Sequence, residues 1–300
     1  MVTGKEKRQV KFNGYKVFSF FNIILMLLIM LVTAYPVYYV IIASFSDPAC
    51  LSIHTEMLWT PLKPFTTSAY KLVFQNRQIL TGFINTFYIM VFGLAVNLFL
   101  TTLGAYFMTI KGPMLKDAIT FLIIFTMYFS GGMIPGYLNI KDLGLLNSLW
   151  ALILSGGLST NNLIIMKSAF QSIPDSLLES ARLDGASYGQ ILVKIMIPLS
   201  KATMAVMVLY YGVARWNGWF AASIYLNDSD LFPLQLVMRN ILSMASQMAG
   251  STGAGADELA QLVELIKYAL IVVATAPILV LYPFLQKYFV KGVMVGAIKG

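Results

Sequence analysis

Charged side chains gather in one short stretch, ESARLDGASYGQILVKIMIP, which runs from Glu179 to Pro198 between two very apolar segments. Its charged members near the centre are Arg182, Asp184 and Lys194. The carboxylates of Glu179 and Asp184 can pair with basic groups or cap backbone groups at helix ends. This is the chemistry of a contact surface, and the apolar flanks must position it.

The residues that most often carry catalysis or hold metals are scarce. The single Cys and the single His, Cys50 and His54, exclude an internal disulfide and leave too few ligands for an all-protein metal site. A Cys/His nucleophile pair at this spacing is formally open, although the pair falls in an expected loop. A membrane-embedded enzyme acting on lipid-linked substrates would need clustered acidic or His residues. Outside the charged stretch, the acidic residues near helices are Asp117 and Glu264, so we predict no catalytic residue and no metal ligand.

The composition indicates that the chain folds in a lipid bilayer. Of its 300 residues, 58% are hydrophobic and 11% are charged, and the mean hydropathy is +0.75. So little polar surface cannot cover a soluble fold, and each long apolar run is near the ~20 residues that cross a bilayer as a helix. The sequence predicts an all-α membrane protein with six transmembrane helices, at about 17–43, 82–110, 118–138, 145–170, 199–220 and 262–285.

Basic residues predict the orientation. With a cytoplasmic N-terminus, 14 of the 21 Lys and Arg residues fall on the inside. The expected organisation is a basic cytoplasmic tail over 1–16, a membrane domain over 17–285 and a cytoplasmic tail over 286–300. The net charge of +8 therefore reflects topology, and its spread over separate segments does not favour nucleic-acid binding.

The charged stretch falls between the fourth and fifth apolar runs, and it reads as a helical hairpin over 172–198. Ser172 to Asp175 has the form of a capping box with Pro174 in the first turn. Gly185 can end this helix in a left-handed conformation, and Ser187 can cap a second short helix, which Pro198 breaks. An interfacial hairpin that rests on lipid headgroups is an open alternative to a protein-docking hairpin.

The hairpin resembles the EAA loop of bacterial ABC importer permeases, in which E-A-A, D-G-A and I-x-L-P follow at fixed spacing. The chain departs at Ser180, where Ala is usual, and at Ile197, where Leu is usual. The resemblance implies that the hairpin couples the membrane domain to an ATPase, through the residues that match: Glu179, Ala181, Asp184, Gly185, Ala186, Ile195 and Pro198.

Two further stretches, 216–236 and 282–300, resemble the carbohydrate branch of these permeases. The resemblance implies a type I importer in the bacterial plasma membrane, with a two-copy ATPase, a second permease subunit and an extracytoplasmic solute-binding protein. The chain itself has no G-x-x-x-x-G-K-[ST] loop, so we expect no cofactor on it and place ATP and Mg on the ATPase. The expected solute is a carbohydrate, and a non-sugar solute is the alternative.

Polar and aromatic residues inside two apolar runs are candidates for the substrate path. The fourth run is interrupted by SGGLSTNN, residues 155–162, whose polar groups suit either helix packing or a path. In the fifth run, spacing places Tyr211, Arg215 and Trp219 on one helix face. An aromatic belt with a snorkelling Arg215 is an equal alternative. The path candidates are Asn161, Asn162, Tyr211, Arg215, Trp216, Asn217 and Trp219.

Overall fold

The computed structural model describes residues 14–47, 50–51, 54, 56–112, 114–248, 263, 266–280 and 283. Across these residues the chain is helical with connecting turns and contains no strand, so the predicted all-α class is confirmed. Residues 1–13 of the expected N-terminal tail lie outside the described residues, as does the expected C-terminal tail. So does the stretch 282–300 that carried part of the resemblance, apart from residue 283.

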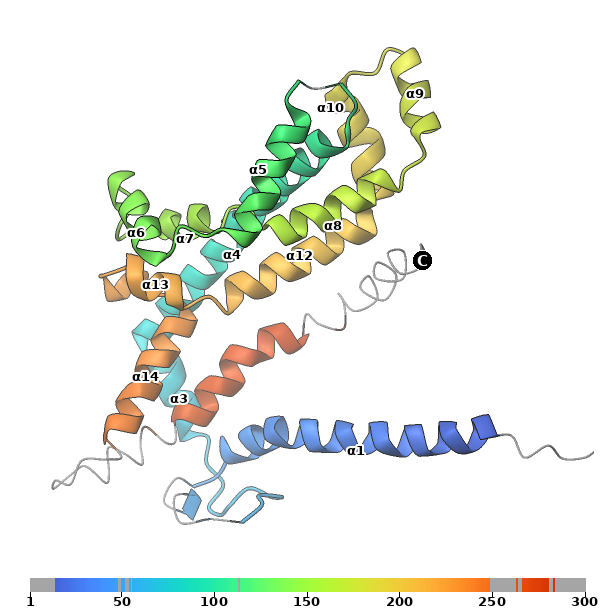
Figure 1. Cartoon of the computed structure of the whole chain (residues 1–300). Helices are drawn as coiled ribbons and strands as arrows, with labels where there is room; N and C mark the ends of the chain where they lie inside the picture. The colour runs from blue at the N-terminus through green and yellow to red at the C-terminus, as the bar shows by residue number, and fades with distance from the viewer. Residues whose placement is uncertain are drawn as a thin grey trace, which may run out of the picture.

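Two helices are long and apolar enough to cross a membrane without a break, α1 (Gly14–Ala43) and α4 (Arg77–Thr109). At ~1.5 Å per residue both exceed the ~30 Å hydrocarbon thickness. α1 begins before the expected boundary at residue 17, and it projects away from the other helices (Figure 1). Only its end, at Ile42 and Ala43, is buried.

The third expected span is two helices instead of one. α5 (Lys116–Tyr128) and α6 (Met133–Asp142) meet at 119°. Gly132, between them, has a φ of +92°, which residues with a Cβ rarely adopt. The expectation of one continuous helix over 118–138 is therefore wrong. Its apolar content predicted a span, but the glycine allows a sharp turn within it.

The fourth expected span is also bent, and a further bend separates the hairpin from the fifth expected span. α7 (Leu149–Ser155) and α8 (Thr160–Gln171) meet at 52°, across the interruption seen in the sequence. The stretch Tyr188–Leu199 meets α12 (Lys201–Trp216) at 83°. If each bent pair is one span, the described residues hold up to 5 spans by length and composition. The described part of the sixth expected run is the shorter apolar helix Ile266–Val280.

α4 is the helix around which the others pack. It contacts α7, α8 and α12, and also α14 (Leu234–Met248). One buried cluster joins α4, α8 and α12 through side chains such as Met108, Phe170 and Met207. A second cluster joins α4 to α14 and to the helix Ile266–Val280. These contacts run along most of the length of α4 (Figure 1).

The segments between the first and second and between the fifth and sixth apolar runs contain helices that those runs did not predict. In α14 the apolar residues recur at helical spacing between polar ones, so the segment is not one apolar run. Leu234 at its start donates its backbone N–H to the Thr86 hydroxyl of α4 at 2.9 Å. The other two are α3 (Ser68–Gln75) and α13 (Phe220–Tyr225).

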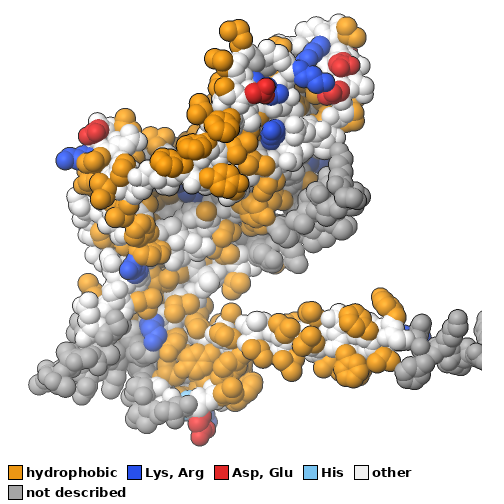
Figure 2. Space-filling view, viewed as in Figure 1, with side chains coloured by type: hydrophobic (Ala, Val, Ile, Leu, Met, Phe, Trp, Pro, Cys, Tyr) orange, Lys and Arg blue, Asp and Glu red, His pale blue; other side chains and the backbone are white. Residues whose placement is uncertain are grey.

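The surface separates into apolar and charged regions. Hydrophobic side chains follow the exposed length of α1, whereas acidic and basic side chains gather at the end of the molecule that carries α9 (Asp175–Leu183) (Figure 2). A soluble protein rarely exposes so large an apolar surface. The arrangement suits a chain whose long helices face lipid or protein and whose α9 end faces water.

Candidate functional site

The helical hairpin turns at Gly185. α9 ends with Gly185 at a φ of +79°, as the sequence predicts. Across this turn Ala186 donates its N–H to the carbonyl of Ala181 at 2.9 Å, and Gly185 donates to that of Arg182 at 3.0 Å. This pair of bonds is a Schellman motif. Two alanines of the EAA-type pattern are thus joined directly by the backbone of the turn.

The caps of the two hairpin helices differ from each other. Ser187 caps the start of α10 (Tyr188–Ile191) as predicted, and Gln190 completes a capping box with it, with bonds of 2.8 and 3.3 Å. The capping box predicted at Ser172 is wrong. The Ser172 hydroxyl donates to the carbonyl of Ala169 at 2.7 Å because Ser172 still belongs to the end of α8. Pro174 occupies the N-cap of α9 without a side-chain bond.

Pro198 does not end the second helix, contrary to expectation. A π-helical turn, η1 (Leu192–Met196), precedes it, and Pro198 lies inside the short α11 (Ile197–Leu199). The wider π turn changes the local backbone register and accommodates a residue without an N–H. The chain bends only after this, around Ser200. Ile195 is half-buried and Pro198 is exposed.

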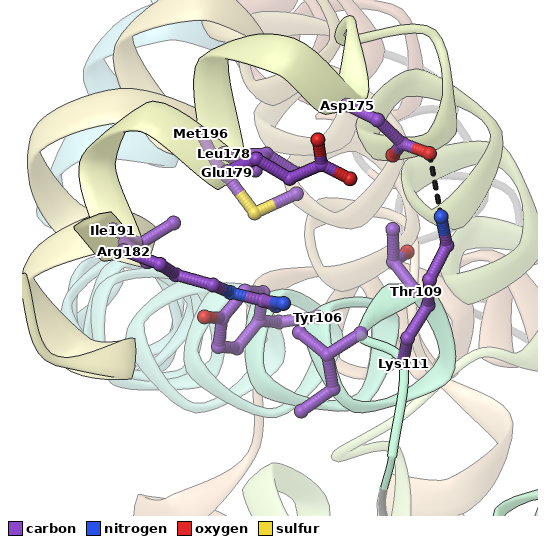
Figure 3. A pocket seen from close by; sticks show the side chains of 10 residues that line it. Tyr106, Thr109, Lys111, Asp175, Leu178, Glu179, Arg182, Ile191 and Met196 are labelled. Carbon is purple, nitrogen blue, oxygen red and sulfur yellow. Dashed lines mark hydrogen bonds and ion pairs between the residues drawn. The ribbon is translucent and has the colours of Figure 1, made fainter.

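The hairpin is attached to the end of α4. Lys111, just beyond α4, donates from Nζ to Asp175 Oδ2 at 2.7 Å, and Tyr106 donates from its hydroxyl to the carbonyl of Tyr188 at 3.0 Å. A small cavity of about 40 Å³ lies between α4 and the hairpin, and its lining includes Tyr106, Lys111, Asp175, Glu179 and Arg182 (Figure 3). Leu178, Ala181 and Ala186 pack on the buried cluster beneath.

The Lys111–Asp175 pair shifts both of its members toward their charged forms. Its hydrogen bond and charge lower the pKa of Asp175 and raise the pKa of Lys111. Both side chains are largely exposed, so solvent screens the pair and its contribution to stability is small. The hydrogen bond nevertheless fixes the start of α9, at Asp175, relative to the end of α4.

The outer surface of α9 carries both charged and apolar groups. Glu179 and Asp184 are exposed, and within the described residues neither forms an ion pair. Leu183 is 89% exposed and Leu177 is 48% exposed. The helical spacing of Ile173, Leu177 and Ala181 predicts that Leu177 is packed, and this prediction is wrong. Leu178 packs in its place, so the exposed leucines lie on the face turned away from the protein.

Arg215 caps the C-terminal end of α7. Its guanidinium donates to the carbonyls of Leu152, Ile153 and Gly156, with Nη2 at 2.9 Å from the second and 2.6 Å from the third. The snorkelling alternative for Arg215 is therefore wrong, because the guanidinium is directed into the protein. The helix dipole favours a cation at this position.

Asn97 of α4 completes the contacts of Arg215. Its Oδ1 accepts from Arg215 Nε at 3.2 Å, while its Nδ2 donates to the carbonyls of Gly156 and Gly157 at 2.6 and 2.8 Å. Asn97 is fully buried. Asn97 was not among the predicted site residues. The available signal was an amide in the middle of a long apolar run.

The other aromatic candidates of the fifth run separate into two sites. Tyr211 is buried, shares a 2.7 Å hydrogen bond with Thr101 and accepts from the Ser159 N–H at 3.1 Å, so Tyr211 and Arg215 do share a face. Trp219 does not, because α12 ends at Trp216. Trp219 instead lies 3.5 Å from the guanidinium of Arg239.

The remaining path candidates differ in exposure. Trp216 is buried and donates from Nε1 to the carbonyl of Ala274 at 3.1 Å. Asn162 is buried near the start of α8, whereas Asn161 beside it is exposed. Asn217 is exposed at the end of α12. Among the described residues, no group of three or more His, Cys, Asp or Glu side chains could hold a metal ion.

Long and bent apolar helices with an exposed helical hairpin define the class of membrane-embedded helical proteins. Comparison with known proteins agrees. The chain is 40% identical to the polygalacturonan/rhamnogalacturonan transport system permease protein YtcP of Bacillus subtilis (strain 168), over 92% of this chain and 96% of that protein. It is 30% identical to the galactooligosaccharides transport system permease protein GanQ of the same organism, over 93% and 95% of the two chains.

A solved structure also matches the fold. A chain of a bacterial ABC transporter involved in the import of the acidic polysaccharide alginate aligns with a TM-score of 0.82 and 31% identity, covering 96% of this chain and 100% of that chain. Residues 118–295 match the family of binding-protein-dependent transport system inner membrane components, and the chain belongs to this family. It is a permease subunit of an ABC importer, and a separate subunit hydrolyses ATP.

Proposed function

We propose that this chain and a second permease chain of different sequence form the path of an oligosaccharide into a bacterial cell. An extracytoplasmic binding protein delivers the solute, and a two-copy ATPase, which holds ATP and Mg, drives the change between outward-open and inward-open states. The hairpin 172–198 docks on the ATPase. In this arrangement both termini and the hairpin are cytoplasmic.

The observation that carries this proposal is the uncovered outer surface of α9. Leu183 is 89% exposed and Asp184 is exposed beside the turn, while Glu179, which lines the cavity toward α4, is exposed as well. A leucine at a water-facing end loses favourable burial unless a partner covers it. The hairpin is also built to transmit force, because a Schellman turn fixes its tip and the Lys111–Asp175 and Tyr106–Tyr188 contacts fix its base. Resting on headgroups would need no such attachment to α4.

The second permease is supported by two helices with little protein cover. α1 has no buried side chain before its last two residues, and α5 has none. On α5 the rings of Phe121 and Phe125 stack at 6.2 Å, and those of Phe125 and Phe129 at 5.4 Å. Lipid can cover part of this surface, and a second permease covers the remainder.

The proposed solute is an oligosaccharide, and we propose an acidic oligosaccharide in particular. One relative is named for polygalacturonan and rhamnogalacturonan, and the matched solved structure is of an importer of the acidic polysaccharide alginate. Both names describe chains that contain uronate sugars. Another relative is named for galactooligosaccharides, which are neutral. A non-sugar solute is the alternative.

The test is transport by the complete importer in proteoliposomes. The chain is purified with its second permease and ATPase, and the binding protein is added with radiolabelled oligogalacturonate, galactooligosaccharide or amino acid. We expect ATP-dependent accumulation of the oligogalacturonate, none of the amino acid, and none without the binding protein. Accumulation of the neutral sugar alone would contradict the acidic class. Accumulation of the amino acid alone would contradict carbohydrate transport.

A further inference from the structure

The break between α7 and α8 leaves irregular backbone uncovered within the membrane-spanning part of the chain. Ser155 and Gly156 are exposed there. Asn97, which binds the break, lies twelve residues before the end of α4 at Thr109, about 18 Å along the helix. That depth is close to the middle of a ~30 Å hydrocarbon layer. Irregular backbone at this depth cannot face lipid, so either protein or a water-filled path must cover the break.

The backbone carbonyls at the break accept hydrogen bonds from side chains of α4 and α12. Gly156 accepts from both Arg215 and Asn97, which occupies both lone pairs of its oxygen. Gly157 accepts from Asn97, and Leu152 and Ile153 accept from Arg215. Two side chains on two other helices therefore supply the donors that a continuous helix would supply from its own backbone.

The position of Arg215 depends on a glycine of α4. A Cβ at Gly93 would lie 2.9 Å from Arg215 Nε, so the guanidinium crosses α4 where no side chain stands. One helical turn further along α4, Asn97 accepts a hydrogen bond from Arg215 Nε. One turn beyond Asn97, the hydroxyl of Thr101 shares a hydrogen bond with that of Tyr211. The face of α4 at positions 93, 97 and 101 thus matches the face of α12 at 211 and 215.

Electrostatics favour a fixed position for Arg215. Within the described residues no carboxylate lies within ion-pair distance of it, and the carbonyl end of α7 balances its charge. Arg215 also lines a cavity of about 80 Å³, together with Leu152 and small residues such as Gly218 and Ala222. If the Arg215 guanidinium moved away, the carbonyls at the end of α7 would lose their donors and the positive charge would lose its hydrogen-bond acceptors.

We propose that Arg215 and Asn97 are positioning residues of the substrate path: they hold the α7–α8 break so that its exposed residues, among them Ser155, Gly156 and Asn161, face the passing solute. This inference rests on the proposed function. The hydroxyl and amide groups of Ser155, Thr160 and Asn161 match the hydroxyl groups of a sugar. Arg215 itself does not contact the sugar, because its donors are directed at α7 and Asn97.

Accessibility of the break provides the first test. Ser155→Cys is placed in a Cys50→Ser background of the complete importer, and labelling by a charged, membrane-impermeant thiol reagent is timed. We expect labelling, slowed at least fivefold when loaded binding protein and a non-hydrolysable ATP analogue trap sugar in the path. Leu27→Cys, on the exposed apolar surface of α1, is the control that should stay unlabelled. No labelling of Ser155→Cys in any state, or labelling that sugar does not slow, would overturn the proposal.

Coupling provides the second test. Arg215→Lys keeps the charge but loses the planar fork that reaches several carbonyls, and Asn97→Leu removes the amide. We expect the number of sugar molecules carried per ATP hydrolysed to fall at least tenfold in each, with hydrolysis stimulated by the binding protein within twofold of wild type. A purely structural role would lower transport and hydrolysis together. Arg77→Met, which removes an exposed charge, is the control and should leave both unchanged.

The outcomes separate this inference from the proposed function. If the unsubstituted importer carries no oligosaccharide, the proposed function fails. If it carries oligosaccharide and Arg215→Lys does so with unchanged transport per ATP, only the positioning role of Arg215 fails.

Discussion

The backbone N–H of Ala186 donates to the carbonyl of Ala181 at 2.9 Å, across a turn in which Gly185 has a φ of +79°. This bond joins the end of α9 to the start of the second hairpin helix. Both alanines belong to the EAA-type pattern. Their small side chains also pack on the buried cluster below the hairpin. The pattern therefore describes the structure of the turn, and it leaves Asp184 and Leu183 exposed beside that turn.

The Lys111–Asp175 pair is expected to hold the base of the hairpin over a wide pH range. The pKa of Asp175 is lowered, so its contribution is present above the usual aspartate pKa and is lost as the pH falls through the lowered value. The pKa of Lys111 is raised, so its contribution is lost only at strongly alkaline pH. Lys111→Met and Asp175→Asn should each speed hydrogen exchange in α9 at neutral pH. The double variant should be no faster than either, and an additive effect would show that the two side chains act separately.

Leu183 is expected to bind the ATPase without stabilising the chain itself. Leu183→Asp should leave the thermal stability of the detergent-solubilised chain unchanged, because the side chain is 89% exposed. Its association with the ATPase should weaken at least tenfold, which is about 1.4 kcal/mol. Met114→Asp is the matched control, since Met114 is equally exposed but lies outside the hairpin. Unchanged ATPase affinity of the Leu183 variant would exclude Leu183 from the contact.

Neighbouring asparagines at the start of α8 should respond differently to truncation. Asn161→Ala removes an exposed amide and should change the apparent affinity or selectivity of uptake severalfold, with thermal stability preserved. Asn162→Ala leaves a void in a buried position and should lower the melting temperature. Radiolabelled uptake and thermal unfolding measure the two effects. Equal transport kinetics for wild type and Asn161→Ala would remove Asn161 from the path.

Orientation is testable by labelling in intact cells. Gln190→Cys, on the hairpin, should react with an impermeant thiol reagent only after the cells are opened, because the basic residues favour the cytoplasmic side. Asn139→Cys, in α6, should react from outside. Cys50→Ser removes the background thiol. Labelling of the hairpin position from outside intact cells would reverse the assigned topology.

Local features of this chain could be predicted from sequence, and contacts between distant segments could not. The turn at Gly185 and the cap at Ser187 depend on a few adjacent residues, so their residue types identify them. Asn97 and Arg215 are 118 positions apart, and no periodicity connects them. The bend at Gly132 was visible as a glycine, but the apolar content of the run outweighed it.

The central claim is that the hairpin is a docking lever whose turn requires Gly185, and one comparison tests it most directly. The complete importer is purified with Gly185→Val and with Gly185→Asn, and ATPase retention, stimulated hydrolysis and uptake are measured together. Valine at positive φ costs about 1–2 kcal/mol, whereas asparagine adopts this conformation more readily. We predict that Gly185→Val inserts normally in the membrane but loses ATPase retention and uptake, and that Gly185→Asn keeps most of both. Normal ATPase retention, hydrolysis and uptake by Gly185→Val would contradict the docking lever and favour a hairpin that rests on lipid headgroups.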